Sequence, residues 1–372
     1  MIRSFLPVGQ GAFYLEQFAF DNDRLNIVYD CGSGTGVELV RQEIINNFRE
    51  RERISAVFIS HLDGDHINGL EFLLQYCRVE NVFFPLISAE NRRLILLSQL
   101  VKGVKPPDFT YAFIQNPYQT LSRETSSPRF YQIGESRRRK GERDEFSGVD
   151  AQVVPSGANV AALILKESPP VPGRLWDRWL YIPFNFRQEH RLRQLKAALE
   201  QELGAAAAGD RLLELWGAAR DRDKIRKAYK QVEGSFNANS LTLFSGDAEA
   251  RAVQVPYDAG RGPFGRPPYA KPSGCLYTGD YNAAGKKEWA ELRQAYEKYW
   301  RSIGCVQIPH HGSRHSYNQE FSHLDSYFII SAGYGNSYRH PHGSVLKDLL
   351  IKRRCPLLVT ERADSAAHLS VY

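Results

Sequence analysis

Apolar positions change their spacing several times within the first 88 residues. Residues 5–8, 12–18 and 25–29 are rich in β-branched and aromatic side chains and are separated by Gly-Gln-Gly and Asp-Asn-Asp, which predicts three strands joined by turns. Residues 37–51 and 67–76 have helical spacing, whereas 54–59 and 79–85 are short apolar runs typical of buried strands. Strand–helix–strand alternation predicts a layered α/β fold.

The last third returns to this alternation after a different middle. We expect strands over 240–244, 275–278, 305–308 and 327–331, and helices over 286–303 and 345–351. We therefore predict an N-terminal half (1–88), an insertion or subdomain (89–234) and a C-terminal half (235–372).

The expected insertion holds two basic segments. Residues 116–150 are rich in Pro, Ser and charge and include the run 137–140, which is either a solvated loop or a phosphate-contacting patch. Residues 187–234 have the apolar stripe of a helical hairpin, with a basic far end at 220–230. Such a stripe is usually packing, but a protein partner for this hairpin stays open.

Composition and charge limit the cellular compartment and the class of protein that this sequence can represent. The 372 residues carry 48 Lys+Arg against 42 Asp+Glu, a net charge of +6 that permits an anionic partner without requiring one. No apolar run approaches the roughly 18 residues of a membrane span, and the N-terminus lacks a signal-peptide core. The five cysteines are scattered without a CxxC pair, which argues against a disulfide framework and a cysteine zinc site. We expect a cytoplasmic protein with no membrane contact.

Histidines cluster in two places, and this clustering asks for a chemical reason. Eight of the ten lie either at 61–66 or between 310 and 342. They follow predicted strands, as does Asp280, and the ends of strands are where layered α/β folds place their sites. Histidine and aspartate together suit a divalent metal.

The segment His61-Leu-Asp-Gly-Asp-His66 has a spacing that fits metal binding. In an extended turn, alternate side chains point to one side, so His61, Asp63 and Asp65 can converge while His66 begins a helix. Gly64 permits a tight turn. One aspartate before a helix is usually a cap, but four such residues backed by later His and Asp positions favour a metal site.

These segments resemble the metallo-β-lactamase superfamily, and more narrowly the soluble metallo-β-lactamase domain of the competence protein ComEC. The second ligand position holds aspartate here. The resemblance covers the body and not the expected insertion, and it is carried by FLPVGQG (5–11), YDCGSG (29–34), SHLDGDHINGL (60–70), NANSLTL (237–243), LYTGD (276–280), PHHGSRHS (309–316) and ISAGYGNSYRHPHGSVL (330–346).

The resemblance implies an αββα sandwich with one or two divalent ions, zinc or manganese, at its edge. It implies metal ligands at His61, Asp63, Asp65, His66, Asp280 and His340. Asp280 would bridge two ions, with Asp247 as a rival, and His342 is a rival of His340. Asp65, His310 and His311 form the expected catalytic set, with His310 or His311 contacting the scissile phosphate or protonating the leaving group; Asn239, Ser313 and His342 are expected to help bind substrate.

One departure from the wider superfamily changes the expected metal. A histidine usual before the strand at 240–244 is replaced by Asn237 and Asn239. Together with Asp63, this makes one half of the site richer in oxygen, which favours manganese as a rival to zinc and permits a single ion.

The resemblance implies metal-assisted phosphodiester hydrolysis, with DNA as the favoured substrate. Two other functions stay open. One is hydrolysis of a small phosphodiester or another ester, because a fold does not fix its substrate. The other is a non-catalytic, metal-stabilised module that binds a partner.

Overall fold

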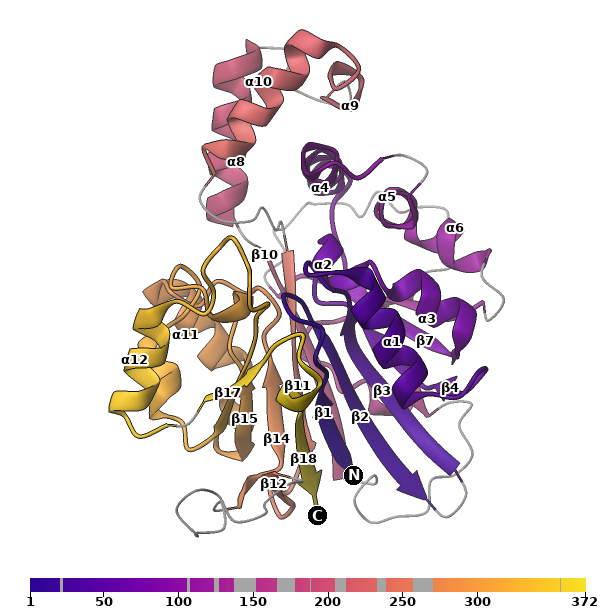
Figure 1. The fold of residues 1–372 in the computed structure, drawn as a ribbon, viewed down its shortest axis with the longest axis vertical. Coiled ribbons are helices and arrows are strands. Elements are labelled where there is room, and N and C mark those ends of the chain that lie inside the picture. Colours follow the sequence, from indigo (N-terminus) through magenta and orange to yellow (C-terminus); the bar gives the residue numbers. More distant parts are fainter. Residues whose placement is uncertain are drawn as a thin grey trace.

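The computed structural model describes residues 1–20, 23–105, 108–123, 127–136, 152–165, 178–187, 189–204, 212–232, 239–256, 270–354 and 356–372. The basic run 137–140 lies outside these residues. Two large sheets pack face to face in the middle, and helices cover their outer faces (Figure 1). None of the described helices has the length and apolar character needed to cross a bilayer.

The first sheet has ten strands, and the order across it is β13-β12-β18-β1-β2-β3-β5-β7-β8-β9. Strands β3, β5, β7, β8 and β9 run parallel, whereas β1, β2 and β18 pair antiparallel. The bounds are β1 Ile2–Phe5, β2 Phe13–Phe20, β3 Asp23–Cys31, β5 Ala56–Phe58, β7 Asn81–Pro85, β8 Arg129–Ile133, β9 Gln152–Val154, β12 Val253–Pro256, β13 Lys271–Pro272 and β18 Ala367–Val371.

The second sheet has six strands in the order β10-β11-β14-β15-β16-β17. Strands β14 to β17 run parallel to one another, and β10 and β11 are antiparallel. The bounds are β10 Trp179–Arg187, β11 Asn239–Asp247, β14 Gly274–Tyr277, β15 Ile303–Gln307, β16 Tyr327–Ser331 and β17 Pro356–Val359; a separate pair consists of β4 Arg53–Ile54 and β6 Arg78–Val79.

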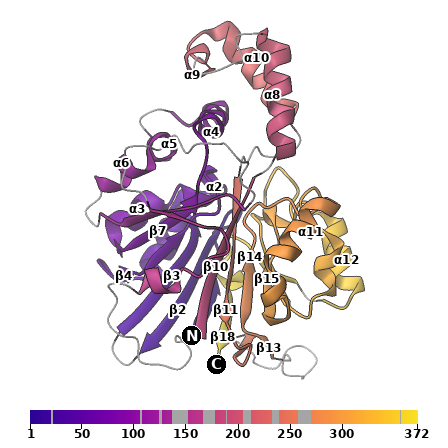
Figure 2. The same ribbon diagram turned by 180° about the vertical axis from the view of Figure 1, so that it is seen from behind.

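The helices form two outer layers and a cap. Helices α1 and α3 cover the first sheet, α11 and α12 cover the second, and α4, α8, α9 and α10 stand above one end (Figures 1 and 2). The bounds are α1 Val37–Asn47, α2 Gly64–Ile67, α3 Leu70–Tyr76, α4 Ala89–Lys102, α5 Phe109–Gln115, α6 Pro117–Ser122, α7 Ala161–Ile164, α8 Glu189–Leu203, α9 Leu212–Leu215, α10 Ala219–Lys230, α11 Lys286–Ala295 and α12 Gly343–Ile351, with short 3-10 turns η4 Glu297–Ser302, η5 His310–Gly312, η6 Gln319–His323 and η7 Ala363–Ser365.

Three apolar clusters fill the spaces between the four layers. On β5, Val57 belongs to the cluster under the N-terminal helices, whereas its neighbours Ala56 and Phe58 belong to the cluster between the sheets. Side chains alternate between the two faces of a strand, so a strand covered on both faces needs an unbroken apolar run. The third cluster lies under the C-terminal helices. This is the predicted αββα architecture.

The residues 89–234 do not form one separate insertion. Strands β8, β9 and β10 come from this range and belong to the two main sheets. The helical hairpin at its end is present as α8 and α10, which project from the top of β10 (Figure 1). The short strands at 129–133 and 152–154 lie beside polar sequence, so apolar periodicity does not separate them from their neighbours in the sequence.

Candidate metal centre

The loop that follows β5 is fixed to the end of β3 by a buried carboxylate. Asp30 accepts hydrogen bonds from the Ser60 amide (2.6 Å) and the Ser60 hydroxyl (2.7 Å), and its Oδ2 lies 2.8 Å from Nδ1 of His66. Gly32 allows this approach, because a Cβ there would lie 2.6 Å from the backbone of Asp65 and His66. The turn at the end of β3 therefore positions the His61–His66 segment.

Three imidazoles are anchored through Nδ1 and present Nε2 to a common space. Nδ1 of His61 lies 2.9 Å from the Ser60 hydroxyl, Nδ1 of His66 contacts Asp30, and Nδ1 of His311 lies 3.0 Å from the Ser331 carbonyl. Their three Nε2 atoms are buried and have no hydrogen-bond partner among the described residues. Metal-binding histidines are held in this way, with one ring nitrogen bonded to the protein and the other facing the ion.

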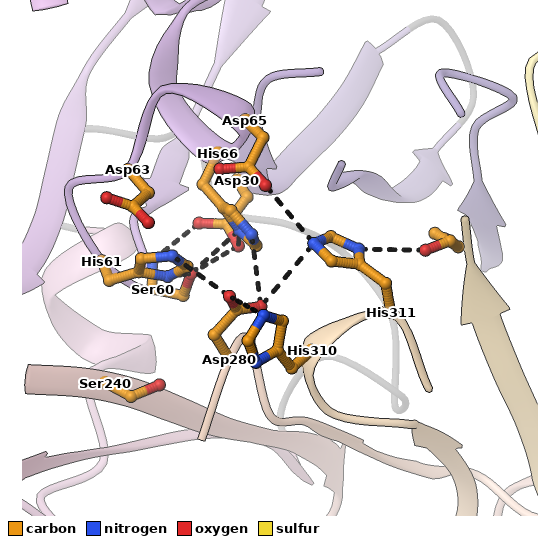
Figure 3. A network of polar contacts seen from close by, with 12 residues as sticks. Asp30, Ser60, His61, Asp63, Asp65, His66, Ser240, Asp280, His310 and His311 are labelled. Atoms are coloured by element: carbon orange, nitrogen blue, oxygen red, sulfur yellow. Dashed lines mark hydrogen bonds and ion pairs between the residues drawn. The ribbon is translucent and has the colours of Figure 1, made fainter. Parts of the chain in front are cut away.

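Asp280, which follows β14, lies at the centre of these rings (Figure 3). Its carboxylate oxygens are 3.4 Å from Nε2 of His66, 3.7 Å from Nε2 of His61 and 3.6 Å from Nε2 of His310. Nε2 of His311 lies 3.4 Å from Oδ2 of Asp65 and 3.9 Å from Oδ1 of Asp280. The segments that follow β5 of the first sheet and β14 and β15 of the second thus bring their His and Asp side chains to one point.

The donor set fits a divalent metal. Two overlapping groups, His61/His66/Asp280 and Asp65/His66/His311, each place their ligand atoms within 4.8 Å of one another, and a third group is His61/Asp63/Asp65. Buried imidazole nitrogens without partners, facing carboxylates, are costly unless a cation satisfies them. His61, His66, His311, Asp65 and Asp280 are the residues that would hold the metal.

His310 and His311 have backbone conformations that cost energy. Their φ angles are 50° and 55°, in the left-handed region that side chains with a Cβ rarely adopt, and Gly312 follows at 78°. Asp30 is also left-handed, at 56°. Strain of this kind, of order 1–3 kcal/mol for each residue, persists where the surrounding structure enforces a functional geometry.

Three other predicted residues, His340, His342 and Asp247, lie outside the three groups of possible metal ligands. His340 is half-buried, with its ring centroid 5.6 Å from that of His310 and 6.2 Å from that of His311, and it belongs to none of the three ligand groups. His342 instead caps α12, accepting from the Ser344 amide at 3.2 Å. Asp247 caps a turn at the far end of β11 by accepting from the amides of Glu249, Arg251 and Ala252.

The expected substrate-binding residues Asn239 and Ser313 are both buried and have protein partners. Nδ2 of Asn239 donates to Asn185 and Glu135 at 3.0 and 3.2 Å, and its Oδ1 has no hydrogen-bond partner among the described residues. The Ser313 hydroxyl accepts from the amide of His315 at 3.3 Å. The other expected residue of that segment, Asn237, lies outside the described residues.

Asp63 has partners that the sequence does not reveal. Gln99 donates to its Oδ1 at 2.8 Å and the Lys102 ammonium lies 2.9 Å from its Oδ2. Asp30, Ser60 and these two residues of α4 were all missed as site residues. Asp30 and Ser60 fall within recognisable motifs, whereas nothing in the sequence of α4 indicates a contact with residue 63.

Burial and charge set the protonation of the metal-free site. Burial lowers the pKa of His66, but the Asp30 and Asp280 carboxylates outweigh it and hold that pKa well above its ordinary value. Burial lowers the pKa of His61 well below its ordinary range and that of His310 to about 3. Burial also raises the pKa of the Asp63 carboxyl, although the positive charge of Lys102 acts in the opposite direction. Burial lowers the pKa of Lys102, but the carboxylates of Asp63 and Asp65 outweigh it and raise that pKa above its ordinary value.

Metal binding is expected to release a proton at neutral pH. Because the pKa of His66 is raised, this residue keeps both ring protons there in the metal-free protein and must lose the Nε2 proton to bind an ion. Affinity should therefore rise with pH, by up to about tenfold per unit, until the pH passes that pKa. Calorimetry in buffers of different ionisation enthalpy should count about one proton released; no release would contradict a charged His66.

Replacing Asp30 by asparagine should weaken metal binding without removing any ligand. The variant loses the carboxylate that fixes the ring of His66, and losses of such supporting partners cost about 10–100-fold in affinity. Competition against a chromophoric chelator measures this change. The exposed Asp364→Asn variant is the control and should bind like the wild type. Wild-type affinity in a folded Asp30→Asn protein would show that Asp30 serves stability alone.

Comparison with known proteins agrees with this architecture. The family model of the metallo-beta-lactamase superfamily matches residues 8–151, and the four-layer structure is the metallo-β-lactamase fold. Ribonuclease Z of Ignicoccus hospitalis is 41% identical over 99 residues, which are 27% of this chain and 29% of that protein. Ribonuclease Z of Crocosphaera subtropica is 38% identical over 50 residues, 13% of this chain and 14% of that one. The chain thus spans less than a third of these curated relatives.

Solved structures give weaker likenesses. Unliganded yeast PDE1 has a TM-score of 0.42 and 7% identity, with 99% of each chain covered. A long form RNase Z from yeast has a TM-score of 0.33 and 11% identity, covering 91% of this chain and 38% of that one.

Proposed function

We propose that this protein is a metal-dependent phosphodiester hydrolase that cleaves nucleic acid. The observation that carries the proposal is the convergence on Asp65 and Asp280 of three buried imidazole nitrogens that have no hydrogen-bond partner among the residues the structure describes. A divalent ion held there supplies Lewis-acid chemistry and lowers the pKa of a water molecule from about 15.7 towards 7. DNA is the first expected substrate, from the ComEC-like motifs; RNA is the second, because the matched relatives are named ribonucleases.

The residues around the metal ligands suit an anionic substrate. Arg191, near the start of α8, is buried. The burial of His310 is the main cause that lowers the pKa of its imidazole, and the positive charge of Arg191 is one of the groups that lower it further. Helix α10 carries six basic and two acidic side chains and projects above the same end of the sheets (Figure 1). Phosphate contacts of this type give sequence-independent affinity that decreases with salt.

We further propose that His311 and His340 have the reverse of their expected roles. His311 shares a ligand group with Asp65 and His66, whereas His340 lies at the half-buried rim beside His310. Burial lowers the pKa of His340 to about 4, so its imidazole is neutral at pH 7. A neutral imidazole at the rim can donate an N–H to the charge that develops on a phosphoryl or leaving oxygen.

Two alanine variants separate these roles. His311→Ala is expected to lose bound metal. His340→Ala should keep its metal content and lose about 10²–10³-fold in kcat, the usual cost of removing one transition-state donor. Metal analysis and single-turnover cleavage measure both properties. Metal loss in His340→Ala with retention in His311→Ala would instead support the roles expected from the sequence, with His340 as a metal ligand and His311 as a catalytic residue.

Substrate class is tested with one set of matched polymers. Single-stranded DNA, double-stranded DNA and RNA of the same sequence are compared with bis(p-nitrophenyl) phosphate, each with manganese, zinc or magnesium. We expect cleavage of a polymer to exceed that of the small ester, and to weaken as salt rises. Hydrolysis of the small ester alone would contradict a nucleic-acid substrate.

A further inference from the structure

Asp63, the second possible ligand in the His61–His66 segment, already forms an ion pair with a cation of the protein, the Lys102 ammonium. The Asp63 carboxylate is buried, and both of its oxygens are engaged: Oδ1 by Gln99 at 2.8 Å and Oδ2 by the Lys102 ammonium at 2.9 Å. In Figure 3 this carboxylate stands apart from the contacts that join Asp280 to the imidazoles.

Lys102 and Gln99 are held in place by a well-anchored helix. They lie three residues apart, so they share one face of α4, and both are directed to the same carboxylate. The helix is fixed at its start by the Ser88 hydroxyl and along its length by Leu94 and Leu97 in the apolar core. It ends at Gly103, which is left-handed (φ 97°). The ammonium is therefore positioned by the fold.

The possible ligand atoms of the histidines are not paired in the way that the Asp63 carboxylate is. Among the described residues, the Nε2 atoms of His61, His66 and His311 have no hydrogen-bond partner, and the carboxylates of Asp280 and Asp65 lie 3.4 to 3.7 Å from them. A divalent ion brought to Asp63 would have to displace a lysine ammonium, because two cations a few ångströms apart in a buried site repel strongly. An ion brought between His66, His311 and the two aspartates displaces only the Nε2 proton of His66, which can leave to solvent, and not a tethered ammonium.

We propose that Lys102 takes the place of a second metal ion beside Asp63, so that the protein binds one divalent ion per chain. The inference rests on the proposed metal centre and identifies its nuclearity. The Lys102 side chain keeps 40% of its surface exposed, while its ammonium pairs with the buried Asp63 carboxylate.

Metal stoichiometry tests this proposal without reference to activity. Metal-stripped protein is dialysed to saturation against Mn²⁺ or Zn²⁺, and bound metal is counted by mass spectrometry. We expect one ion in the wild type, one in Lys102→Arg, and two in Lys102→Met, which frees the Asp63 carboxylate while keeping the length of the side chain. Asp63→Asn should still bind one ion with wild-type affinity.

Several results would contradict the proposal that Lys102 takes the place of a second metal ion. Two ions in the wild type would do so whether or not any variant folds. One ion in folded Lys102→Met, or loss of the single ion in folded Asp63→Asn, would equally contradict it. Cleavage is measured separately: one bound ion without cleavage of any substrate would refute the proposed function and leave the role of Lys102 standing.

Discussion

Asp280→Asn is expected to abolish phosphodiester cleavage while the protein stays folded. Asp280 lies within 3.4 to 3.9 Å of Nε2 of four histidines, so its charge is the one that all of them share. A metal contributes several kcal/mol to transition-state stabilisation, and loss of about 4 kcal/mol corresponds to roughly 10³-fold in rate. Metal content and single-turnover rates should fall together.

Asp247→Asn is the matched control for Asp280→Asn. Each aspartate is the second residue of a Gly-Asp pair at or just after the end of a strand, but Asp247 caps a turn at the opposite end of β11 from the histidines. This variant should keep its metal and its activity. Equal loss of cleavage in both variants, at equal stability, would contradict the central position of Asp280.

Glu16→Ala is expected to cost the most stability of any single polar substitution between the sheets. Oε1 of Glu16 is 2.8 Å from Nε of Arg3 and accepts from the Tyr277 hydroxyl at 2.8 Å, while Oε2 accepts from Tyr181 and Ser245 at 2.7 Å each. The pair links β1 and β2 of the first sheet to three strands of the second. Removing one partner of a buried ion pair leaves the other charge uncompensated, at a cost of about 3–5 kcal/mol.

Urea unfolding measures this loss. The midpoint should fall for Glu16→Ala with little change in the slope. Glu38→Ala removes the glutamate of an exposed pair with Arg41 and should change stability by no more than about 0.5 kcal/mol. A loss below about 1 kcal/mol for Glu16→Ala would mean that Arg3 finds another buried partner.

The sequence predicts the body of this fold well because its central strands are covered on both faces. Strands such as β5 and β16 are short, unbroken apolar runs, and their positions are found to within a residue or two. The predictions are poorer where pairing depends on distant residues. β18 pairs with β1 from the opposite end of the chain. Ala367, Leu369 and Val371 alternate with polar residues as in a strand, but that pattern does not identify β1 as the partner.

The candidate site shows the same division. Motif spacing places His61, His66 and Asp280 in one cluster, because each follows a strand that ends at the same edge. It does not show which of several neighbouring histidines joins the group of possible metal ligands: that depends on the left-handed backbone of His310 and His311, and on the Ser331 carbonyl that anchors His311. Nor does it show Lys102, whose contact with Asp63 spans 39 positions.

The most direct test of the account is metal add-back to stripped protein. Nucleic-acid cleavage is measured as Mn²⁺ or Zn²⁺ is titrated in, alongside the amount of ion bound. The account predicts no cleavage by the stripped protein and a rate that rises in proportion to occupancy of the site formed by His66, His311, Asp65 and Asp280. Cleavage that persists without metal, or a fully loaded protein that cleaves no phosphodiester, would contradict it.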